Sequence, residues 1–379
     1  MINPSYFQSG DLNLAEFARL CQQTTELGSY PSAEGIIDNV VVYSGKKLVH
    51  DAGASLNSEL VHCLRQGPGV FVVRGAYADL SVIDRCTNVL TRIVAQETAA
   101  GQGHGDHFGS NQRVWNSLQK TCVAGPELFV DYYSNSILHT AAEAWLGPNY
   151  RITAQMNNIK PGGEAQSPHR DYHLGFQTSE NVARFPLHAQ VMSQFLTLQG
   201  AIAHGDMPVE TGPTLLLPYS QLYPLGYLAG PQPEFADYFA QHSVQLPLEK
   251  GDALFFNPAL LHAGGSNASN RDRIANLIQI SSAFGQTMES IDHRTMIESV
   301  YPVLQRLSAD ARGSEQQIDR VIATVADGYS FPTNLDSDPP LAGNAPETQQ
   351  GLVRRALAGS WTIGQLRDQL EHHRQRRQA

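Results

Sequence analysis

The sequence predicts a mainly β fold whose core is a double-stranded β-helix, or jelly roll, flanked by N-terminal and C-terminal helices. Between residues 150 and 285, short apolar runs are separated by turn-forming residues, the pattern of strands in a two-sheet barrel. On both sides of this region, apolar residues recur at helical spacing instead. Within it, histidines and aspartates at strand spacing predict a polar site at the mouth of the barrel.

The N-terminal part, residues 1–149, is expected to be helical with one buried strand. Residues 55–65 predict a helix, which Gln66-Gly67-Pro68-Gly69 ends before a strand at 70–74. A further helix is expected at 127–145, because Gly147 and Pro148 follow it as a stop signal. Between these elements, one amphipathic helix is expected to pack an apolar stripe on the sheet through Val82, Ile83, Cys86, Leu90, Ile93 and Val94.

The core, residues 150–285, is expected to supply the strands of the jelly roll. The apolar segments that predict them are 151–160, 191–202, 214–217, 245–248, 253–256 and 273–280. The C-terminal part, residues 286–379, is expected to extend this core with helices at 289–307, 315–325, 349–358 and 362 to about 374. Residues 331–348 are rich in Pro, Asn, Asp and Gly and predict an irregular loop, and Thr362 with Gln365 predicts a capping box. We expect the three parts to form one compact unit.

The composition restricts the partners. The chain has 379 residues and a formal net charge of −10 at pH 7, with a pI near 5.7. Nucleic acids and anionic membrane surfaces select basic patches, so we expect neither and expect a small-molecule substrate. The four cysteines are scattered and lack Cys-x-x-Cys spacing, which predicts reduced thiols. The sequence also has no apolar span and no signal-like N-terminus, so we expect a cytoplasmic protein. The oligomeric state stays open, and a homo-oligomer is compatible with the sequence.

The strongest site signal is His169-Arg170-Asp171, followed downstream by His262 and Arg273. Residues i and i+2 of a strand point the same way, so His169 and Asp171 can reach one ion together. Two imidazoles and one carboxylate are the ligand set of non-haem Fe(II) oxygenases. Eleven residues after His262, the chain has room to turn through Gly264-Gly265-Ser266-Asn267 and return with Arg273, whose guanidinium can fork onto a carboxylate.

The same residues are also compatible with a purely structural role, without a metal. His169 and Asp171 can form a surface hydrogen-bonded pair, and His262 can be a satisfied core histidine. A second match, His104-Gly105-Asp106-His107, has the same spacing but lies among glycines that predict a loop, whereas Pro168 favours extended backbone at His169. The joint occurrence with Arg273 favours the metal site.

At this point the chain resembles the phytanoyl-CoA dioxygenase family of Fe(II)/2-oxoglutarate-dependent oxygenases, over roughly residues 60 to 285. The segments that carry the resemblance are His169-Arg170-Asp171-Tyr172-His173, Gly212 to Ser220, Gly251 to His262, Arg113 to Asn116, and Asn158 to Gly162. It implies that Fe(II), 2-oxoglutarate and O2 are used, with release of succinate and CO2. It also implies roles for single residues: His169, Asp171 and His262 as iron ligands, Arg273 as the anchor of the distal carboxylate of 2-oxoglutarate, Asn158 as a residue facing 2-oxoglutarate, and Arg113 as a basic residue near the pocket.

Two positions depart from the family pattern. The usual Pro-Gly-Ser-His turn is Pro218-Tyr219-Ser220-Gln221 here, which bears on the pocket rim. The hydroxyl commonly found two places after the distal histidine is replaced by Gly264, which removes a hydrogen bond to the cosubstrate. A water or Thr214 would have to replace that bond.

His173 is the further residue of interest, because two positions after Asp171 it would share the strand face of the ligands. There it would contact the substrate or support the metal site. The alternative interpretation is a histidine at the barrel rim that bonds to solvent. Arg113, Trp115, Asn116 and Lys120 are candidates to line the pocket, against the alternative of a packed Trp among exposed charges, and residues 101–109 are a candidate lid.

Three functions stay open at this stage: a small-molecule hydroxylase, a non-catalytic jelly-roll module that binds metal or metabolite, and a cupin-type enzyme that needs no 2-oxoglutarate. The third leaves Arg273 without a role.

Overall fold

The protein, described here by a computed structural model for residues 4–101, 111–309, 314–340 and 343–378, is built around two β-sheets. The larger has eight strands in the order β1-β2-β3-β9-β6-β11-β5-β4, and the smaller has three in the order β10-β7-β8. The strands are β1 (Gly35–Ile37), β2 (Val40–Ser44), β3 (Val70–Arg74), β4 (Gln112–Val114), β5 (Arg151–Ile159), β6 (Thr197–Ala203), β7 (Thr214–Leu216), β8 (Val244–Gln245), β9 (Ala253–Phe256), β10 (His262–Gly264) and β11 (Arg273–Ser281).

Helices precede, interrupt and follow the strands. They are α1 (Leu14–Cys21), α2 (Gly45–His50), α3 (Ala54–Arg65), α4 (Leu80–Ala99), α5 (Ser117–Ala124), α6 (Pro126–Tyr133), α7 (Ser136–Leu146), α8 (Ser179–Val182), α9 (Leu187–Ser193), α10 (Gly226–Ala229), α11 (Pro233–His242), α12 (His293–Ala309), α13 (Glu315–Val325), α14 (Gln349–Ala358) and α15 (Ile363–Arg376). No helix in the described ranges is long and apolar enough to cross a membrane.

The central strands of the large sheet set the face on which each side chain lies. β11 pairs antiparallel with β5 and β6, so Arg273 lies opposite Ile159, and Gln279 lies opposite Thr153 and Gln199. Side chains alternate between the faces, so the odd-numbered residues of these three strands share one face and the even-numbered residues the other. The odd face looks toward the small sheet, where apolar residues of both sheets pack in one cluster that includes Leu216, Leu254 and Phe256.

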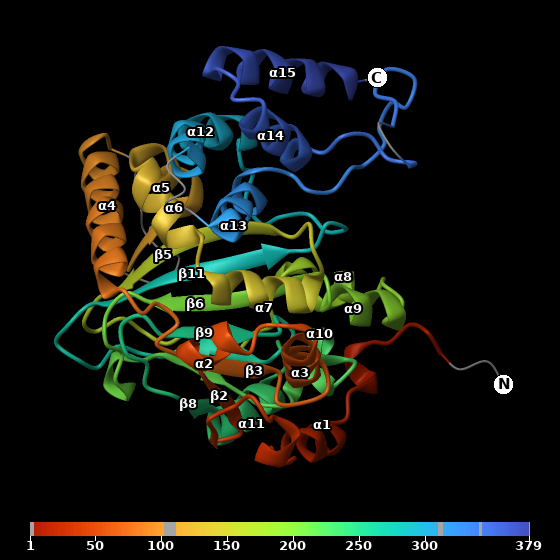
Figure 1. Ribbon diagram of the computed structural model, residues 1–379. Helices are drawn as coiled ribbons and strands as arrows, with labels where there is room; N and C mark the ends of the chain where they lie inside the picture. Colours follow the sequence, from red (N-terminus) through yellow and green to blue (C-terminus); the bar gives the residue numbers. More distant parts are fainter. Residues whose placement is uncertain (1–3, 102–110, 310–313, 341–342, 379) are drawn as a thin grey trace.

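The other face of the large sheet is covered by helices. The largest apolar cluster joins the even-numbered strand residues, such as Ile152, Ala154 and Ile280, to buried residues of α3 to α7, α12 and α13. Figure 1 shows α4 to α7 and α13 along this face, with α14 and α15 farthest from the sheet. Burial of this face by helices leaves the opposite face free to build a site.

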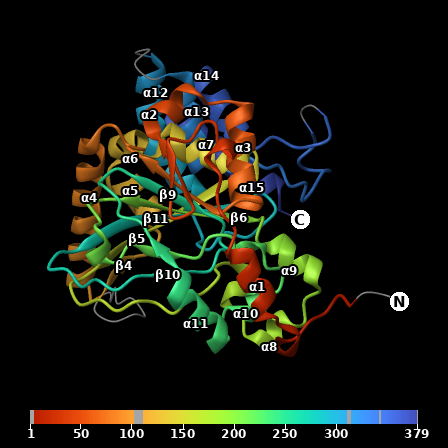
Figure 2. The same cartoon turned by 90° about the horizontal axis from the view of Figure 1, so that it is seen from below.

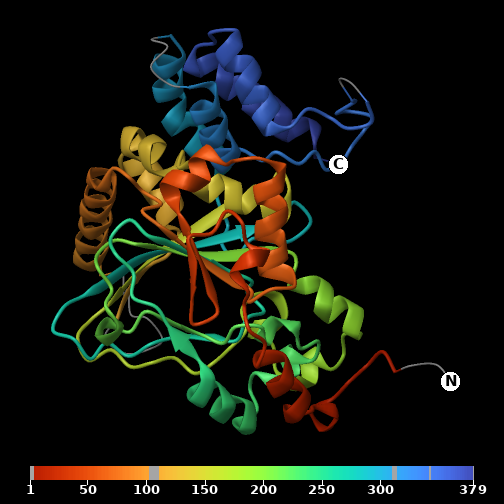
Figure 3. The same ribbon diagram turned by 60° about the horizontal axis from the view of Figure 1, so that its bottom comes forward.

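A second group of helices packs away from that layer. Figure 2 shows α1, α8, α9, α10 and α11 gathered together, and they share an apolar cluster centred on Phe17, Leu228 and Phe235. Figure 3 shows the first helix (red) and the last helices (blue) at opposite ends of the molecule. The two ends of the chain therefore cover different sides of the sheets.

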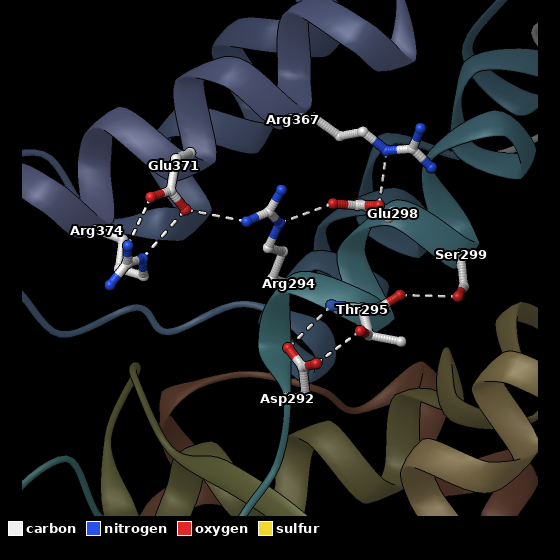
Figure 4. Close-up of polar contacts among 8 residues, drawn as sticks. All are labelled: Asp292, Arg294, Thr295, Glu298, Ser299, Arg367, Glu371 and Arg374. Carbon is white, nitrogen blue, oxygen red and sulfur yellow. Dashed lines mark hydrogen bonds and ion pairs between the residues drawn. The ribbon is translucent and has the colours of Figure 1, made fainter.

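Charged side chains connect the C-terminal helix to α12. Arg294 pairs with Glu298 of its own helix at 2.9 Å and with Glu371 of α15 at 3.0 Å, and Arg367 of α15 returns to Glu298 at 2.7 Å (Figure 4). These side chains are partly exposed, so the pairs orient α15 more than they stabilise it.

Most predicted elements are confirmed. The two-sheet core, the apolar stripe of α4, the irregular course of the described part of 331–348 and the capping box between Thr362 and Gln365 are all present. The mainly β description is not confirmed, because helices hold more of the described residues than strands do. The prediction of one helix over 127–145 was wrong, because Asn135 caps a new helix at that point, its side chain accepting hydrogen bonds from Ile137 and Leu138.

Three strands of the N-terminal part were not predicted, namely β1, β2 and β4. The first two form a hairpin across Asp38 and Asn39, both with positive φ (48° and 67°). The expected strand at 191–202 also begins late, since α9 occupies Leu187–Ser193 and β6 starts at Thr197.

Candidate metal and cosubstrate site

His169, Asp171 and His262 converge where the small sheet is extended by one bridge. His169 and His262 exchange both backbone hydrogen bonds, at 2.9 and 3.1 Å, and the Asp171 N–H donates to the carbonyl of Pro258 at 2.9 Å. His262 begins β10, which pairs with β7. His262, which is distant from His169 and Asp171 in the sequence, therefore lies on a segment that pairs with theirs.

The side chains of these residues present one donor atom each to a common point. The Nε2 of His169 lies 3.6 Å from Asp171 Oδ1, and the Nε2 of His262 lies 3.5 Å from Asp171 Oδ2. The three potential ligand atoms lie within 4.8 Å of one another. A metal ion bonded to all three atoms at about 2.0–2.2 Å would fit between them after small side-chain movements.

The tautomers of both histidines suit metal binding. Nδ1 of His169 lies 2.8 Å from the carbonyl oxygen of Ser167, and Nδ1 of His262 lies 2.8 Å from that of Leu260. A carbonyl only accepts, so each Nδ1 carries the proton and each Nε2 keeps a lone pair. This arrangement fixes the ring orientation in the way that supporting partners of metal-bound histidines do.

The protonation states are also suitable. Burial tends to raise the pKa of Asp171, but the adjacent side chains of His262 and His169 and the hydrogen bond from the Gln199 amide together hold this pKa at about 2. Burial and the neighbouring His262 lower the pKa of His169. At neutral pH the set therefore offers an ionised carboxylate and a neutral His169 imidazole, the forms that bind a divalent cation.

A cavity of about 490 Å³ opens beside the three side chains, and Arg273 lies in its wall. Within the described residues, the partly buried guanidinium donates to the carbonyl oxygens of Thr211 and Gly265, at 3.4 and 3.3 Å. Within the described residues Arg273 has no acidic partner, and burial lowers its pKa to about 10, so it stays charged. A partly buried cation with such long contacts suits an anionic ligand that enters through the cavity.

Thr214 is placed to replace the hydroxyl missing at Gly264. The two residues are directly paired in the β7–β10 register. Thr214 and Arg273 line both the main cavity and a small recess that adjoins it. A Cβ at Gly264 would lie 3.0 Å from Oε1 of Gln166, which accepts the Gly264 N–H, so a side chain there would require the Gln166 side chain to shift.

The expectation that Asn158 faces the cosubstrate was wrong. Asn158 lies on the helix-covered side of the sheet, opposite Ile274, and its amide donates to Asp272 at 3.0 Å. The neighbouring Asn157 lines the cavity instead. A shift of one residue in a strand moves a side chain to the other face of the sheet. The prediction assigned to Asn158 the face that Asn157 occupies.

The expectation for His173 was also wrong, because the strand does not continue past Asp171. Tyr172 and His173 both have positive φ (62° and 45°), and a 3-10 turn begins at His173. His173 contacts Thr197 at 3.4 Å and lines a separate surface groove near α8 and α9. The turn brings Phe176 to the cavity in its place.

Arg113 lies in the cavity wall, as expected. It donates to Gln155 at 3.1 Å, and its guanidinium lies 5.4 Å from the centre of the Trp115 ring, which also lines the cavity. The second His-x-Asp match at 104–107 and nearly all of the candidate lid at 101–109 lie outside the described residues.

Gln199 is a candidate site residue that the sequence analysis missed. Its amide donates a short hydrogen bond to Asp171 Oδ2, and the side chain lines the cavity. The signal was present: Thr197, Gln199 and Ala201 alternate with Leu198 and Ile202, and the odd positions are the ones turned toward the ligands.

Comparisons with known proteins identify the family of the chain. A family model described as phytanoyl-CoA dioxygenase (PhyH) matches residues 65–275. Dioxygenase trt7 of Aspergillus terreus is 27% identical over 183 residues, 47% of this chain and 58% of that protein. Dioxygenase cdmA of Talaromyces verruculosus is 30% identical over 183 residues, 47% of this chain and 57% of that protein. The match thus spans less than two thirds of either relative.

Among solved structures, AviO1 from Streptomyces viridochromogenes Tue57 superposes with a TM-score of 0.45 and 18% identity, covering 62% of this chain and 99% of that chain. The epimerase SnoN in complex with Fe3+, alpha ketoglutarate and nogalamycin RO superposes with a TM-score of 0.43 and 18% identity, covering 60% and 84%.

Proposed function

Because the chain belongs to the phytanoyl-CoA dioxygenase family of Fe(II)/2-oxoglutarate-dependent oxygenases, we propose that it oxidises a small molecule with turnover of 2-oxoglutarate to succinate and CO2. One observation carries the proposal. Three donor atoms of the expected types lie within 4.8 Å of one another, beside a cavity whose wall holds a partly buried arginine without an acidic partner in the described chain. Metal and cosubstrate would thus meet in one cavity.

His169, Asp171 and His262 would hold the iron on one face and leave its other positions toward the cavity. Both imidazoles are held by backbone carbonyls, and Gln199 holds Asp171 Oδ2, so little ordering remains for metal binding. Bound iron, with 2-oxoglutarate and O2, supplies the oxidising chemistry.

Arg273 would bind the distal carboxylate of 2-oxoglutarate. A planar guanidinium forms two parallel hydrogen bonds with a carboxylate and stays charged at any working pH. Thr214 would donate a third, because it lines the same recess. The space that remains toward Arg113, Trp115 and Phe176 would receive the substrate, so a small molecule with some apolar surface fits this part of the cavity.

The test is turnover of 2-oxoglutarate by purified protein supplied with Fe(II), with succinate measured in the absence of any added substrate. We expect uncoupled turnover in the wild type and none in Asp171→Ala, which loses the only anionic ligand. Asp368→Ala, which changes an exposed aspartate of α15, serves as the control and should match the wild type. Succinate release that survives in Asp171→Ala would rule out this site.

The same assay addresses the rival reading of a non-catalytic module. If the wild type binds Fe(II) and 2-oxoglutarate, for example by calorimetry, but releases no succinate, the protein is a binding module and the enzymatic proposal is wrong.

A further inference from the structure

Arg170, between the two ligands His169 and Asp171, is a buried cation with an unusual set of partners. Only 4% of the residue is exposed, and within the described chain it forms no ion pair. Burial lowers its pKa to about 10, so the side chain remains charged at neutral pH. An unpaired buried charge is costly, and its presence calls for compensating contacts.

Backbone carbonyls and an aromatic ring provide those contacts. Nη2 of Arg170 donates to the carbonyl oxygens of Ser220 at 2.5 Å and Tyr223 at 3.1 Å, and the guanidinium lies 5.5 Å from the centre of the Tyr227 ring. The guanidinium rests directly on Gly226, where a Cβ would lie 1.6 Å from Cζ. The segment around α10 is therefore shaped to receive this guanidinium.

Ser220 contacts the segment of the third ligand as well. Its hydroxyl accepts the N–H of Leu261 at 2.8 Å and donates to the carbonyl of Leu217 at 2.6 Å. Leu261 directly precedes His262 in the chain. One residue thus holds the neighbour of His169 and Asp171 through its carbonyl, and the neighbour of His262 through its hydroxyl.

The turn that presents Ser220 is itself held in an uncommon conformation. Tyr219 has φ 67°, a region that favours glycine, and its N–H donates to the carbonyl of Pro68. Its hydroxyl shares a hydrogen bond with Thr25 at 2.8 Å. These contacts fix the turn from the N-terminal side and explain how a tyrosine is accommodated there.

We infer that Arg170 and Ser220 form a brace that positions the two ligand-bearing segments against each other and so sets the affinity of the site for its metal. The inference rests on the proposed metal site, but not on catalysis. Neither residue touches the metal position. Both are positioning residues that act through the backbone at 169–171 and 261–262.

Two variants and one probe metal test the brace. Arg170→Met keeps an unbranched apolar stem but lacks the guanidinium and cannot donate to the two carbonyls, and Ser220→Ala removes only the hydroxyl. Partners that orient metal ligands typically change affinity 10- to 100-fold. We expect the dissociation constant for Co(II), measured by competition with a chelating dye, to rise at least tenfold in Arg170→Met and several-fold in Ser220→Ala, with partial recovery in Arg170→Lys.

Controls separate positioning from general stability. Ser299→Ala removes a hydroxyl that bonds to a carbonyl within α12, and Val321→Ala destabilises the core of α13, both far from the site. Each should bind Co(II) as the wild type does, even where its unfolding temperature falls. If Arg170→Met does not fold, Ser220→Ala and Arg170→Lys decide the question.

A readout without metal makes the outcome independent of the proposed function. Amide hydrogen exchange in the metal-free protein should accelerate at His169, Asp171 and His262 in the brace variants and stay unchanged in the controls. Co(II) affinity within twofold of the wild type, together with unchanged exchange at these amides, would overturn the brace. If the wild type binds no Co(II), the proposed function fails and the exchange data alone judge the brace.

Discussion

Removal of the Thr214 hydroxyl should weaken binding of 2-oxoglutarate without affecting the metal. Thr214→Val keeps the shape of the side chain, so the packing of β7 against β10 is preserved. It removes the hydroxyl that lies in the same recess as Arg273, where Gly264 has none to offer. The variant should weaken the affinity for 2-oxoglutarate and leave metal affinity unchanged, because Thr214 contributes no metal ligand.

The magnitude follows from the charge of the acceptor. A hydrogen bond to a charged group contributes about 1.5–3 kcal/mol. At about 1.4 kcal/mol for each factor of ten, the dissociation constant of 2-oxoglutarate should rise about 10- to 100-fold. Arg273→Met removes the positive charge that pairs with the carboxylate. It should raise the dissociation constant of 2-oxoglutarate further, beyond the range in which binding is measurable at millimolar ligand.

Calorimetric titration of the Mn(II)-loaded protein with 2-oxoglutarate measures both effects without turnover. Thr121→Val is the matched control, because Thr121 is buried in α5 and its hydroxyl has no hydrogen-bond partner among the described residues. If Thr214→Val binds 2-oxoglutarate within twofold of the wild type while Arg273→Met does not bind it, Thr214 has no part in the cosubstrate site and a water takes its place.

Three further predictions concern stability. Burial raises the pKa of Glu289 from 4.5 to about 7, so the folded state binds the proton of this carboxyl group more tightly than the unfolded state does. The free energy of unfolding therefore falls as the pH rises from about 4.5 to 7. The total fall is at most about 3 kcal/mol. The wild type should therefore lose about 1–3 kcal/mol relative to Glu289→Gln between pH 5 and pH 8 in urea unfolding, and an equal gap at both pH values would contradict the assignment. Asn135→Ala should lower the free energy of unfolding by about 1 kcal/mol or more, because it loses the α7 cap and the hydrogen bond from Nδ2 to the Ala76 carbonyl. Asn135→Asp loses only the second of these and should cost less; equal losses would exclude capping as the cause. Arg294→Ala, which breaks the partly exposed pairs to Glu298 and Glu371, should cost less than Asn135→Ala, and the loss should vanish in 1 M NaCl; a loss that persists in salt would point to packing instead.

The metal site was predictable because local rules determine it. His169 and Asp171 follow Pro168, which favours extended backbone, so spacing by two residues placed both side chains on one side. His262 and Arg273 were singled out by their spacing, which leaves room for a turn and a returning strand, and this matches the observed β10 and β11.

The errors arose where a single residue changes the geometry. Asn158 and Asn157 differ by one step along β5, and the sequence contains two adjacent asparagines without a local signal for register. The turn after Asp171 places Tyr172 and His173 at positive φ, although neither is a glycine or an asparagine that would have indicated it. By contrast, the hairpin across Asp38 and Asn39 carried a recognisable turn signal between apolar residues and was overlooked.

The order of strands in the large sheet has a practical consequence for anyone who wishes to shorten the protein. The residues that match the family end at 275, three residues into β11, which lies between β5 and β6. A fragment cut at 65 and 275 would lack most of this central strand and would leave β3 without its partner β2, with bare backbone groups open to association. Expression trials should therefore retain the chain from before β1 through β11, and sequence similarity is a poor guide to where this protein can be divided.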